Sequence, residues 1–71
     1  MKINSNIVRL KMLEKGFNVK EMAKRTDLAY ATISRVLNSP NEYSYKTIAK
    51  ISKVLNCSPA DIIRNENDRA D

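Results

Sequence analysis

The sequence predicts an all-α domain of five short helices, and three observations support this fold class. The composition, with 42% hydrophobic residues, one Gly and two Pro, is typical of an ordered chain that favours helices. Apolar residues recur at steps of three and four in short segments, and capping residues separate these segments. A single cysteine and no histidine exclude a disulfide-stapled mini-protein and a structural zinc finger, so helix packing has to supply the core.

The length of 71 residues is enough for one packed core only. We expect a domain over residues 1–64 and a polar, disordered tail over residues 65–71. Apolar runs are too short for a membrane-spanning helix or a signal peptide, which favours a cytoplasmic protein without a membrane partner. A core of this size contributes only about 3–5 kcal/mol, so oligomerisation is an expected source of further stability.

The first helix is expected to run from residue 5 or 6 to residue 15. Ile7, Leu10 and Leu13 recur at three-residue steps and are predicted to form its buried face, which Val8 and Met12 widen. Residues 1–4 form either a short extended arm or a frayed end.

The second helix is expected to follow Gly16, a residue that accepts the left-handed backbone conformation at a helix end. Asn18 is predicted to cap the amides of residues 20 and 21, and Glu21 to complete a capping box. Met22 faces inward, and Asp27 suits the tight turn after the helix because Asp tolerates positive φ.

The third helix is predicted over residues 30–37, with Ile33, Val36 and Leu37 turned inward. A turn follows at residues 38–41, where Asn, Ser, Pro and Asn stand together. A fourth helix is expected over residues 45–55, because Ser44 is a cap and apolar residues recur at helical spacing: Ile48, Ile51, Val54 and Leu55.

The fifth helix is short and begins after Asn56, which favours a left-handed end to the fourth helix. Ser58, Pro59 and Asp61 give the cap, the proline at the first helical position and the acid at the third. Cys57 is expected to fill a small apolar gap between these two helices.

The positive charge is distributed unevenly along the chain. Residues 1–38 hold eight Lys and Arg against three Asp and Glu, a net charge of +5, and residues 39–71 hold five of each. A polyanion suits such a surface, because contacts with phosphates release condensed counterions. Charge alone does not separate this interpretation from a solvated, lysine-rich helix face.

Two short helices joined by a turn, over residues 18–38, make a helix-turn-helix candidate. Ala23 lies where two helices cross closely, and Leu28 fills the turn from inside. The outer face of the second helix of the pair would then carry small and polar residues: Tyr30, Ala31, Ser34, Arg35 and Asn38, with Thr32 on the flank.

In these segments the chain resembles the phage-repressor family of Cro/C1-type (XRE-like) helix-turn-helix proteins. The Ala-Thr-Ile-Ser-Arg stretch at 31–35 is similar to the family's recognition helix, and residues 55–63 are similar to the last two helices of a compact subgroup. The resemblance covers residues 5–63 and implies a lambda-repressor-like DNA-binding domain. The chain departs from the family pattern at four positions: Val19, Asp27, Ala29 and Leu37 replace a polar residue, a glycine, a capping Ser or Thr and a glutamate.

The outer face of the third helix is predicted to read base edges in the major groove. The planar fork of Arg35 suits guanine O6 and N7, and the methyl group of Ala31 suits a thymine methyl. Tyr30 and Ser34 complete the base-reading set. Phosphate contacts are expected from the start of the second helix and from both flanks of the third: Asn18, Val19, Lys20, Thr32, Asn38, Tyr43, Ser44 and Lys46.

The leading interpretation is a sequence-specific transcriptional regulator, most simply a repressor, that binds an inverted-repeat operator as a homodimer. The dimer surface is expected at the uncharged end formed by the fourth and fifth helices, unless Ile62 and Ile63 only close the core of one protomer. The alternative is a protein-interaction module, such as an antitoxin or anti-repressor, that keeps the fold and acts through a partner protein. An enzyme is not expected, because no nucleophile stands with a base and no carboxylates are paired. No cofactor, metal or small-molecule ligand is expected.

Overall fold

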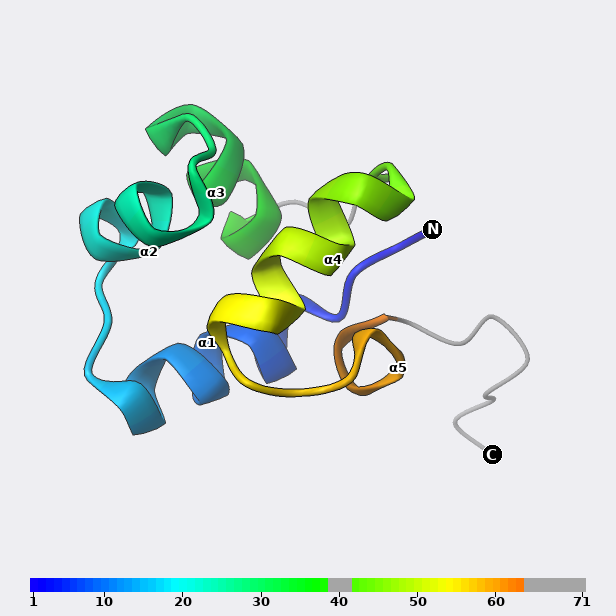
Figure 1. The fold of residues 1–71 in the computed structure, drawn as a ribbon, viewed down its shortest axis with the longest axis horizontal. Coiled ribbons are helices and arrows are strands. Elements are labelled where there is room, and N and C mark those ends of the chain that lie inside the picture. The colour runs from blue at the N-terminus through cyan, green and yellow to red at the C-terminus, as the bar shows by residue number, and fades with distance from the viewer. Residues whose placement is uncertain (39–41, 64–71) are drawn as a thin grey trace.

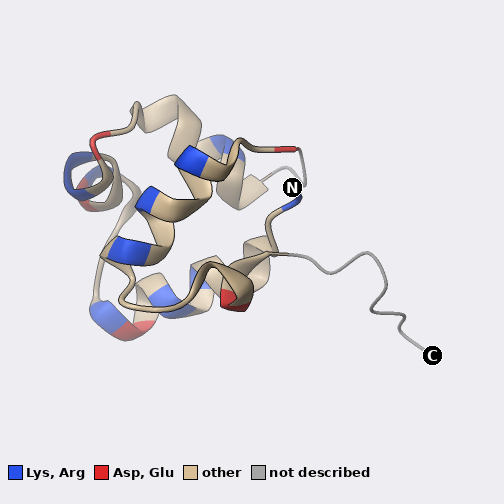
Figure 2. Cartoon of the chain, turned by 45° about the vertical axis from the view of Figure 1, so that its right-hand side comes forward, with Lys and Arg blue, Asp and Glu red and all other residues tan. Residues whose placement is uncertain are grey.

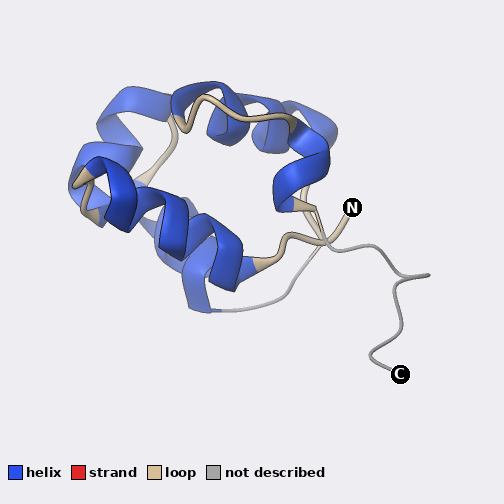
Figure 3. Ribbon diagram, turned by 90° about the horizontal axis from the view of Figure 1, so that it is seen from below, coloured by secondary structure: helices blue, strands red, loops and turns tan. Residues whose placement is uncertain are grey.

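The computed structural model describes residues 1–38 and 42–63, and this part of the chain is helical with no strand (Figures 1 and 3). Residues 39–41 of the predicted turn at 38–41 lie outside the described residues, as does the predicted tail, whereas Asn38 is still part of the third helix. Within the described ranges five helices follow one another in the expected order: α1 (Ser5–Lys15), α2 (Val19–Thr26), α3 (Tyr30–Asn38), α4 (Tyr45–Val54) and α5 (Pro59–Ile62). α3 ends one residue later than predicted and α4 one residue earlier. The fold-class prediction is therefore confirmed. Each helix within the described residues is too short or too polar to cross a membrane.

Side chains close the start of four helices, as the sequence indicates for three of them. Asn18 accepts a hydrogen bond from the Glu21 amide (2.8 Å), and Ser44 accepts one from the Thr47 amide (3.2 Å). A full capping box opens α5, and Asn4, which was not predicted as a cap, opens α1. The capping box predicted for α2 is formed only in part, because the Glu21 carboxylate lies 2.6 Å from Arg25 Nε and pairs with that guanidinium.

Three residues in the left-handed conformation end the helices or their last turns. Gly16 has φ 72°, Asp27 has φ 60° and Asn56 has φ 57°. All three are residue types that tolerate positive φ, which is why the sequence indicated each of these ends.

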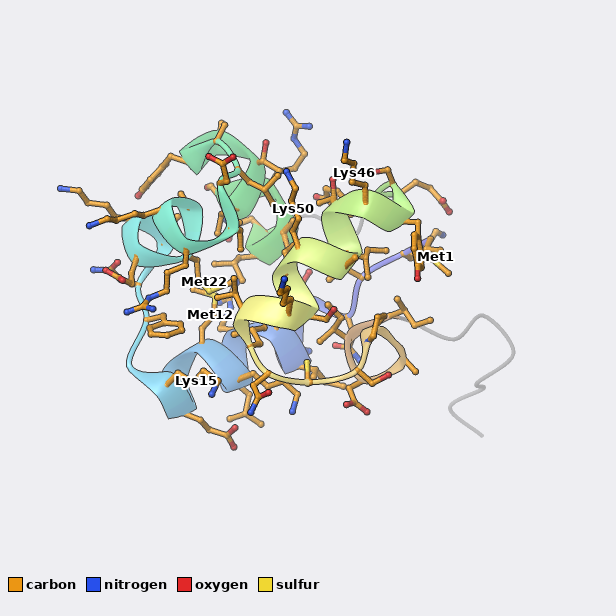
Figure 4. The ribbon with its side chains drawn as sticks, in the orientation of Figure 1. Met1, Met12, Lys15, Met22, Lys46 and Lys50 are labelled. Atoms are coloured by element: carbon orange, nitrogen blue, oxygen red, sulfur yellow. The ribbon has the colours of Figure 1, made fainter. Side chains whose placement is uncertain are left out.

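One apolar core joins all five helices and the residues before α1. Among its fully buried side chains are Met22, Ile33 and Val36 from the α2–α3 pair and Ile48 and Ile51 from α4. Figure 4 shows Met12 of α1 and Met22 of α2 pointing into the interior between the helices. The core therefore holds α2 and α3 from beneath and leaves their other sides exposed.

The predicted buried face of α1 is wrong in part. Val8 and Met12, expected only to widen it, are 1% and 5% exposed, whereas Leu10 and Leu13 are 55% and 75% exposed. Both pairs have helical spacing, so periodicity alone does not say which of them faces the core. The packing of α1 against α3 and α5 selects the side that carries Val8 and Met12.

Residues 1–4 form the extended arm rather than a frayed end. Lys2 pairs with Glu42 and Ile3 with Ile63 in antiparallel bridges, and the Asn4 amide donates to the Ile62 carbonyl (2.7 Å). Ile3 is only 1% exposed, so the arm contributes to the core and joins the segment before α4 to the end of α5.

The end of the molecule where α4 and α5 meet is closed by the protomer's own packing. Ile62 is 0% exposed, and Ile63 and Cys57 are partly buried against the core. Burial raises the pKa of the Cys57 thiol above its ordinary value. Of the two interpretations of Ile62 and Ile63, the structure favours closure of the core over a free dimer surface.

Candidate nucleic-acid interface

The turn between α2 and α3 is fixed by bonds on both of its sides. The Thr26 hydroxyl is buried and donates to the Met22 carbonyl (2.6 Å), and the Leu28 amide donates to the Ala23 carbonyl (3.2 Å). Asp27 between them supplies the left-handed residue. Ala23 and Leu28 pack against the core as predicted, so the two helices are held as one unit.

The outer face of α3 stands clear of the folded body. Ile33, Val36 and Leu37 are buried beneath it, while Tyr30 is 59% exposed. Of the four predicted base-reading residues, three are exposed and one, Ser34, is half-buried: Tyr30, Ala31, Arg35 and Ser34. Within residues 1–38 and 42–63, no carboxylate pairs with the Arg35 guanidinium. Arg35 therefore has its donors available on a convex helix face.

Asn38 and Ser34 bond to each other at the end of this face. Asn38 Nδ2 donates to the Ser34 carbonyl (2.8 Å) and lies 3.4 Å from the Ser34 hydroxyl oxygen. The shorter bond occupies one amide hydrogen of Asn38, and the longer bond would have to give way before the second amide hydrogen could reach an outside acceptor. Thr32, on the flank, is half-buried.

The C-terminal end of α3 is held by two donors from α1, which the sequence analysis missed. Ser5 Oγ donates to the Val36 carbonyl (2.6 Å), and Arg9 Nη2 donates to the Leu37 carbonyl. The last carbonyls of a helix lack partners within it and carry partial negative charge, so a guanidinium satisfies them well. Ser5 and Arg9 lie four residues apart, but their acceptors are backbone atoms and leave no signal in the sequence.

Within residues 1–38 and 42–63, no side chain bonds to the backbone at the N-terminal end of α3 in a comparable way. The Ala29 carbonyl accepts from the amides of Thr32 (3.0 Å) and Ile33 (3.2 Å), but its methyl side chain cannot cap the first free amides. This end carries Tyr30 and Ala31.

Residues predicted to contact phosphates lie on two flanks of α3, at the starts of α2 and α4 (Figure 1). At α2, the amides of Val19 and Lys20 are among the first of the helix and have no acceptor within it. The Val19 side chain packs against the core, so only the backbone amide of Val19 is available for a phosphate contact. Asn18 is exposed but uses its side-chain oxygen as the cap.

Near the start of α4, the residues predicted to contact phosphates differ in how far their side chains are exposed. Tyr43 packs its ring against the core. Ser44 is the exposed cap of α4, and its hydroxyl also donates to Thr47 Oγ1 (3.1 Å). Lys46 is exposed one turn into the helix.

The structure adds a stripe of lysines along α4 that the charge count concealed. Lys46, Lys50 and Lys53 recur at steps of four and three, on the side opposite the buried Ile48 and Ile51. Figure 2 shows these positive bands following one another along the helix, and Figure 4 shows Lys46 and Lys50 projecting to the same side. We name this set the lysine stripe.

Two of the carboxylates that bring the net charge of residues 39–71 to zero bond to groups other than the lysine stripe. Glu42 pairs with the Met1 ammonium (2.7 Å), which lowers the pKa of the Glu42 carboxyl below its ordinary value. Asp61 accepts from the Ser58 amide in the α5 capping box (3.0 Å). The lysine stripe is thus a local positive surface although its half of the sequence is neutral.

The comparisons with known proteins agree with this geometry. A model of the Cro/C1-type helix-turn-helix DNA-binding domain matches residues 8–68. No curated protein and no solved structure matches the chain. The matched range includes α2, α3 and the lysine stripe, and it confirms the resemblance inferred from residues 31–35 and 55–63. The chain therefore belongs to the Cro/C1-type helix-turn-helix family of DNA-binding domains.

Proposed function

We propose that the protein is a sequence-specific transcriptional regulator, most simply a repressor, which inserts α3 into the major groove of an inverted-repeat operator. The observation that carries the proposal is the outer face of α3, which is exposed and presents Arg35 without a carboxylate partner in the described part of the chain. A helix of this diameter fits the major groove of B-DNA. We assign the DNA-binding unit to residues 1–64 and place its action in the cytoplasm.

Arg35 is assigned the central base contact, because its fork can donate two hydrogen bonds to guanine O6 and N7. Ala31, one turn earlier, allows close approach of the helix and places a methyl group against a thymine methyl. Tyr30 and Ser34 occupy the neighbouring row and donate hydroxyl hydrogens to base edges.

Phosphate contacts would fix the orientation of α3 from two sides. At α2 the donors are the free amides of Val19 and Lys20, with Asn18 and the Lys20 ammonium beside them. On the other side they are the second amide hydrogen of Asn38, the Ser44 hydroxyl, which would turn from Thr47 Oγ1 to the phosphate, and the Lys46 ammonium. Thr32 is half-buried, so its contact would come from its hydroxyl group. The Tyr43 hydroxyl oxygen is buried, so a contact from Tyr43 would require its ring to turn outward.

A homodimer is part of the proposal, because one module of this size contacts few base pairs. Useful specificity requires a second half-site, and two-fold symmetry places two recognition helices in major grooves about 34 Å apart. The operator would then be an inverted repeat with one half-site per helical turn.

Footprinting on the DNA that flanks the protein's own gene tests the proposal. We expect protection of an inverted repeat, and affinity for that site that falls steeply as salt rises. Equal affinity for the flanking DNA and for random DNA at every salt concentration would contradict base reading. That result would favour a module that acts through a partner protein.

A further inference from the structure

The surface proposed to contact DNA is divided between two helices whose main packing partners are other helices. α3 carries Arg35, and the start of α4 carries Ser44 and Lys46. Within residues 1–38 and 42–63, α3 packs mainly against α1 and α2, whereas α4 packs mainly against α2 and α5. The spacing between the base-reading helix and the phosphate contacts at α4 therefore depends on other elements of the fold.

At the end of α3, two side chains of α1 hold the last turn. Ser5 Oγ donates to the Val36 carbonyl (2.6 Å), and Arg9 Nη2 donates to the carbonyl of the next residue, Leu37. Both acceptors are carbonyls that a helix leaves without partners at its end, and the Arg9 bond is charge-assisted. Val36 directly follows Arg35, so these bonds fix the turn from which the Arg35 side chain projects.

The arm that precedes α1 bonds to the segment just before α4. The Tyr43 amide donates to the Met1 carbonyl (2.8 Å), and Lys2 pairs with Glu42 in an antiparallel bridge. Ser44, the cap of α4, follows directly. In Figure 1 the N-terminal segment runs from α1 toward the start of α4. One continuous stretch of chain thus holds both the end of α3 and the start of α4.

We name this stretch, residues 1–9, the brace. The brace is itself anchored in the core, because Ile3 and Val8 are each 1% exposed. The Asn4 amide also donates to the Ile62 carbonyl (2.7 Å), which ties the brace to the end of α5. The brace is therefore a fixed reference for both of the helices that it holds.

We propose that the brace sets the spacing between α3 and the start of α4, and that Arg9 and Ser5 are positioning residues for base reading. Base contacts need alignment to within about 0.5 Å, whereas a flexible lysine reaches a phosphate from a wider range of positions. Loss of the Arg9 bond would let α3 shift against the phosphate contacts, and the paired hydrogen bonds of Arg35 would weaken first. This inference rests on the proposed function and adds that the choice between sequences depends on side chains that act through α3.

Affinities for two duplexes test the inference: the sequence that the wild type selects from random DNA, and a scrambled version of it. For Arg9→Met we expect the ratio of the two affinities to fall at least about fivefold, because a bidentate base contact depends on alignment. Ser5→Ala removes a neutral hydrogen bond and should lower the ratio by less. Arg9→Lys keeps a charged donor and should recover most of the wild-type ratio.

The ratio separates positioning from a purely structural role. A variant that is only less stable has a smaller folded fraction, which lowers both affinities by the same factor and leaves their ratio unchanged. Lys15→Met is the matched control, because it removes one positive charge from an exposed position of the same helix. Figure 4 places Lys15 on the side of the molecule away from Lys46 and Lys50, so this variant should keep the wild-type ratio.

Two results would overturn the inference while the proposed function stands. If the wild type prefers its selected sequence and Arg9→Met keeps the full preference, the Arg9 bond does not position α3 for reading. If Arg9→Met weakens both duplexes equally and makes the salt dependence shallower, Arg9 is a phosphate contact instead. A wild type without sequence preference would contradict base reading itself, and this would be seen before any variant is measured.

Discussion

The two ends of α3 are held very differently. At the C-terminal end, Ser5 and Arg9 donate to the last carbonyls and Leu37 is buried. At the N-terminal end, Ala29 provides no side-chain cap and Tyr30 is 59% exposed. In helix-turn-helix proteins the N-terminal residues of the recognition helix contact base edges. The chain thus anchors α3 at its C-terminal end and leaves its N-terminal end, which carries two of the proposed base-reading residues, without a side-chain cap.

α2 differs from α3, because residues directly next to it in the sequence close both of its ends. Asn18 caps its start, and Asp27 in the left-handed conformation ends it. α3 instead depends at its end on side chains from α1, which is distant in sequence. The position of α3 in the fold is therefore coupled to α1 through two hydrogen bonds.

The substitution Arg9→Met breaks this anchor and has the largest expected effect on stability. A charged hydrogen bond to a helix carbonyl is lost, and we expect the free energy of unfolding to fall by about 2 kcal/mol in urea titrations. Lys24→Met, at an exposed cation on α2, is the control and should change stability by less than about 0.5 kcal/mol. Equal effects of the two substitutions would mean that the Arg9 bond does not hold α3.

The helix boundaries could be predicted from the sequence because their determinants are local. Asn18, Ser44 and Ser58 cap the helices that directly follow them, and Gly16 and Asp27 have conformational preferences of their own. Ile33, Val36 and Leu37 define one buried stripe of α3, so most of its outer face was also predicted correctly as exposed. Ser34 is the exception and is half-buried.

A cap at Ala29 should remove the difference between the two ends of α3. Ala29→Ser places a hydroxyl acceptor where the first amides of α3 lack one, and we expect a gain of about 1 kcal/mol in unfolding free energy. Hydrogen exchange at the first amides of α3 should slow as well. The matched change on the other helix, Asn18→Ala, should lose a similar amount. An unchanged stability for Ala29→Ser would show that this end is already satisfied.

The least predictable features depend on which distant segments meet. Periodicity favoured Leu10 and Leu13 for the buried face of α1, with Val8 and Met12 only widening it. The position of α3 and α5 buries Val8 and Met12 instead. Ile3 enters the core because the arm pairs with Glu42 and Ile63, neither of which is near it in sequence. The lysine stripe was concealed because a charge sum ignores the direction in which side chains project.

The lysine stripe should contribute modestly to DNA affinity, and by the same amount for every DNA sequence. Lys50→Gln removes one cation of the lysine stripe, and loss of one phosphate contact with it should make the slope of log affinity against log salt shallower by about 0.9. Specific and random DNA should be affected alike. Lys15→Gln is the control, because Figure 4 places Lys15 on the side of the molecule away from Lys46 and Lys50. Equal salt slopes for Lys50→Gln and wild type would remove Lys50 from the interface.

The most direct test of base reading by α3 is a competition measurement with Arg35→Ala. The wild type is first used to select its preferred sequence from random duplexes, and affinities for that sequence and for a scrambled one are measured at fixed salt. The account predicts that Arg35→Ala binds the selected sequence far more weakly, by about 1–3 kcal/mol, and nearly loses its preference over the scrambled one. A variant that retains the full preference would contradict the claim that α3 reads the operator through Arg35.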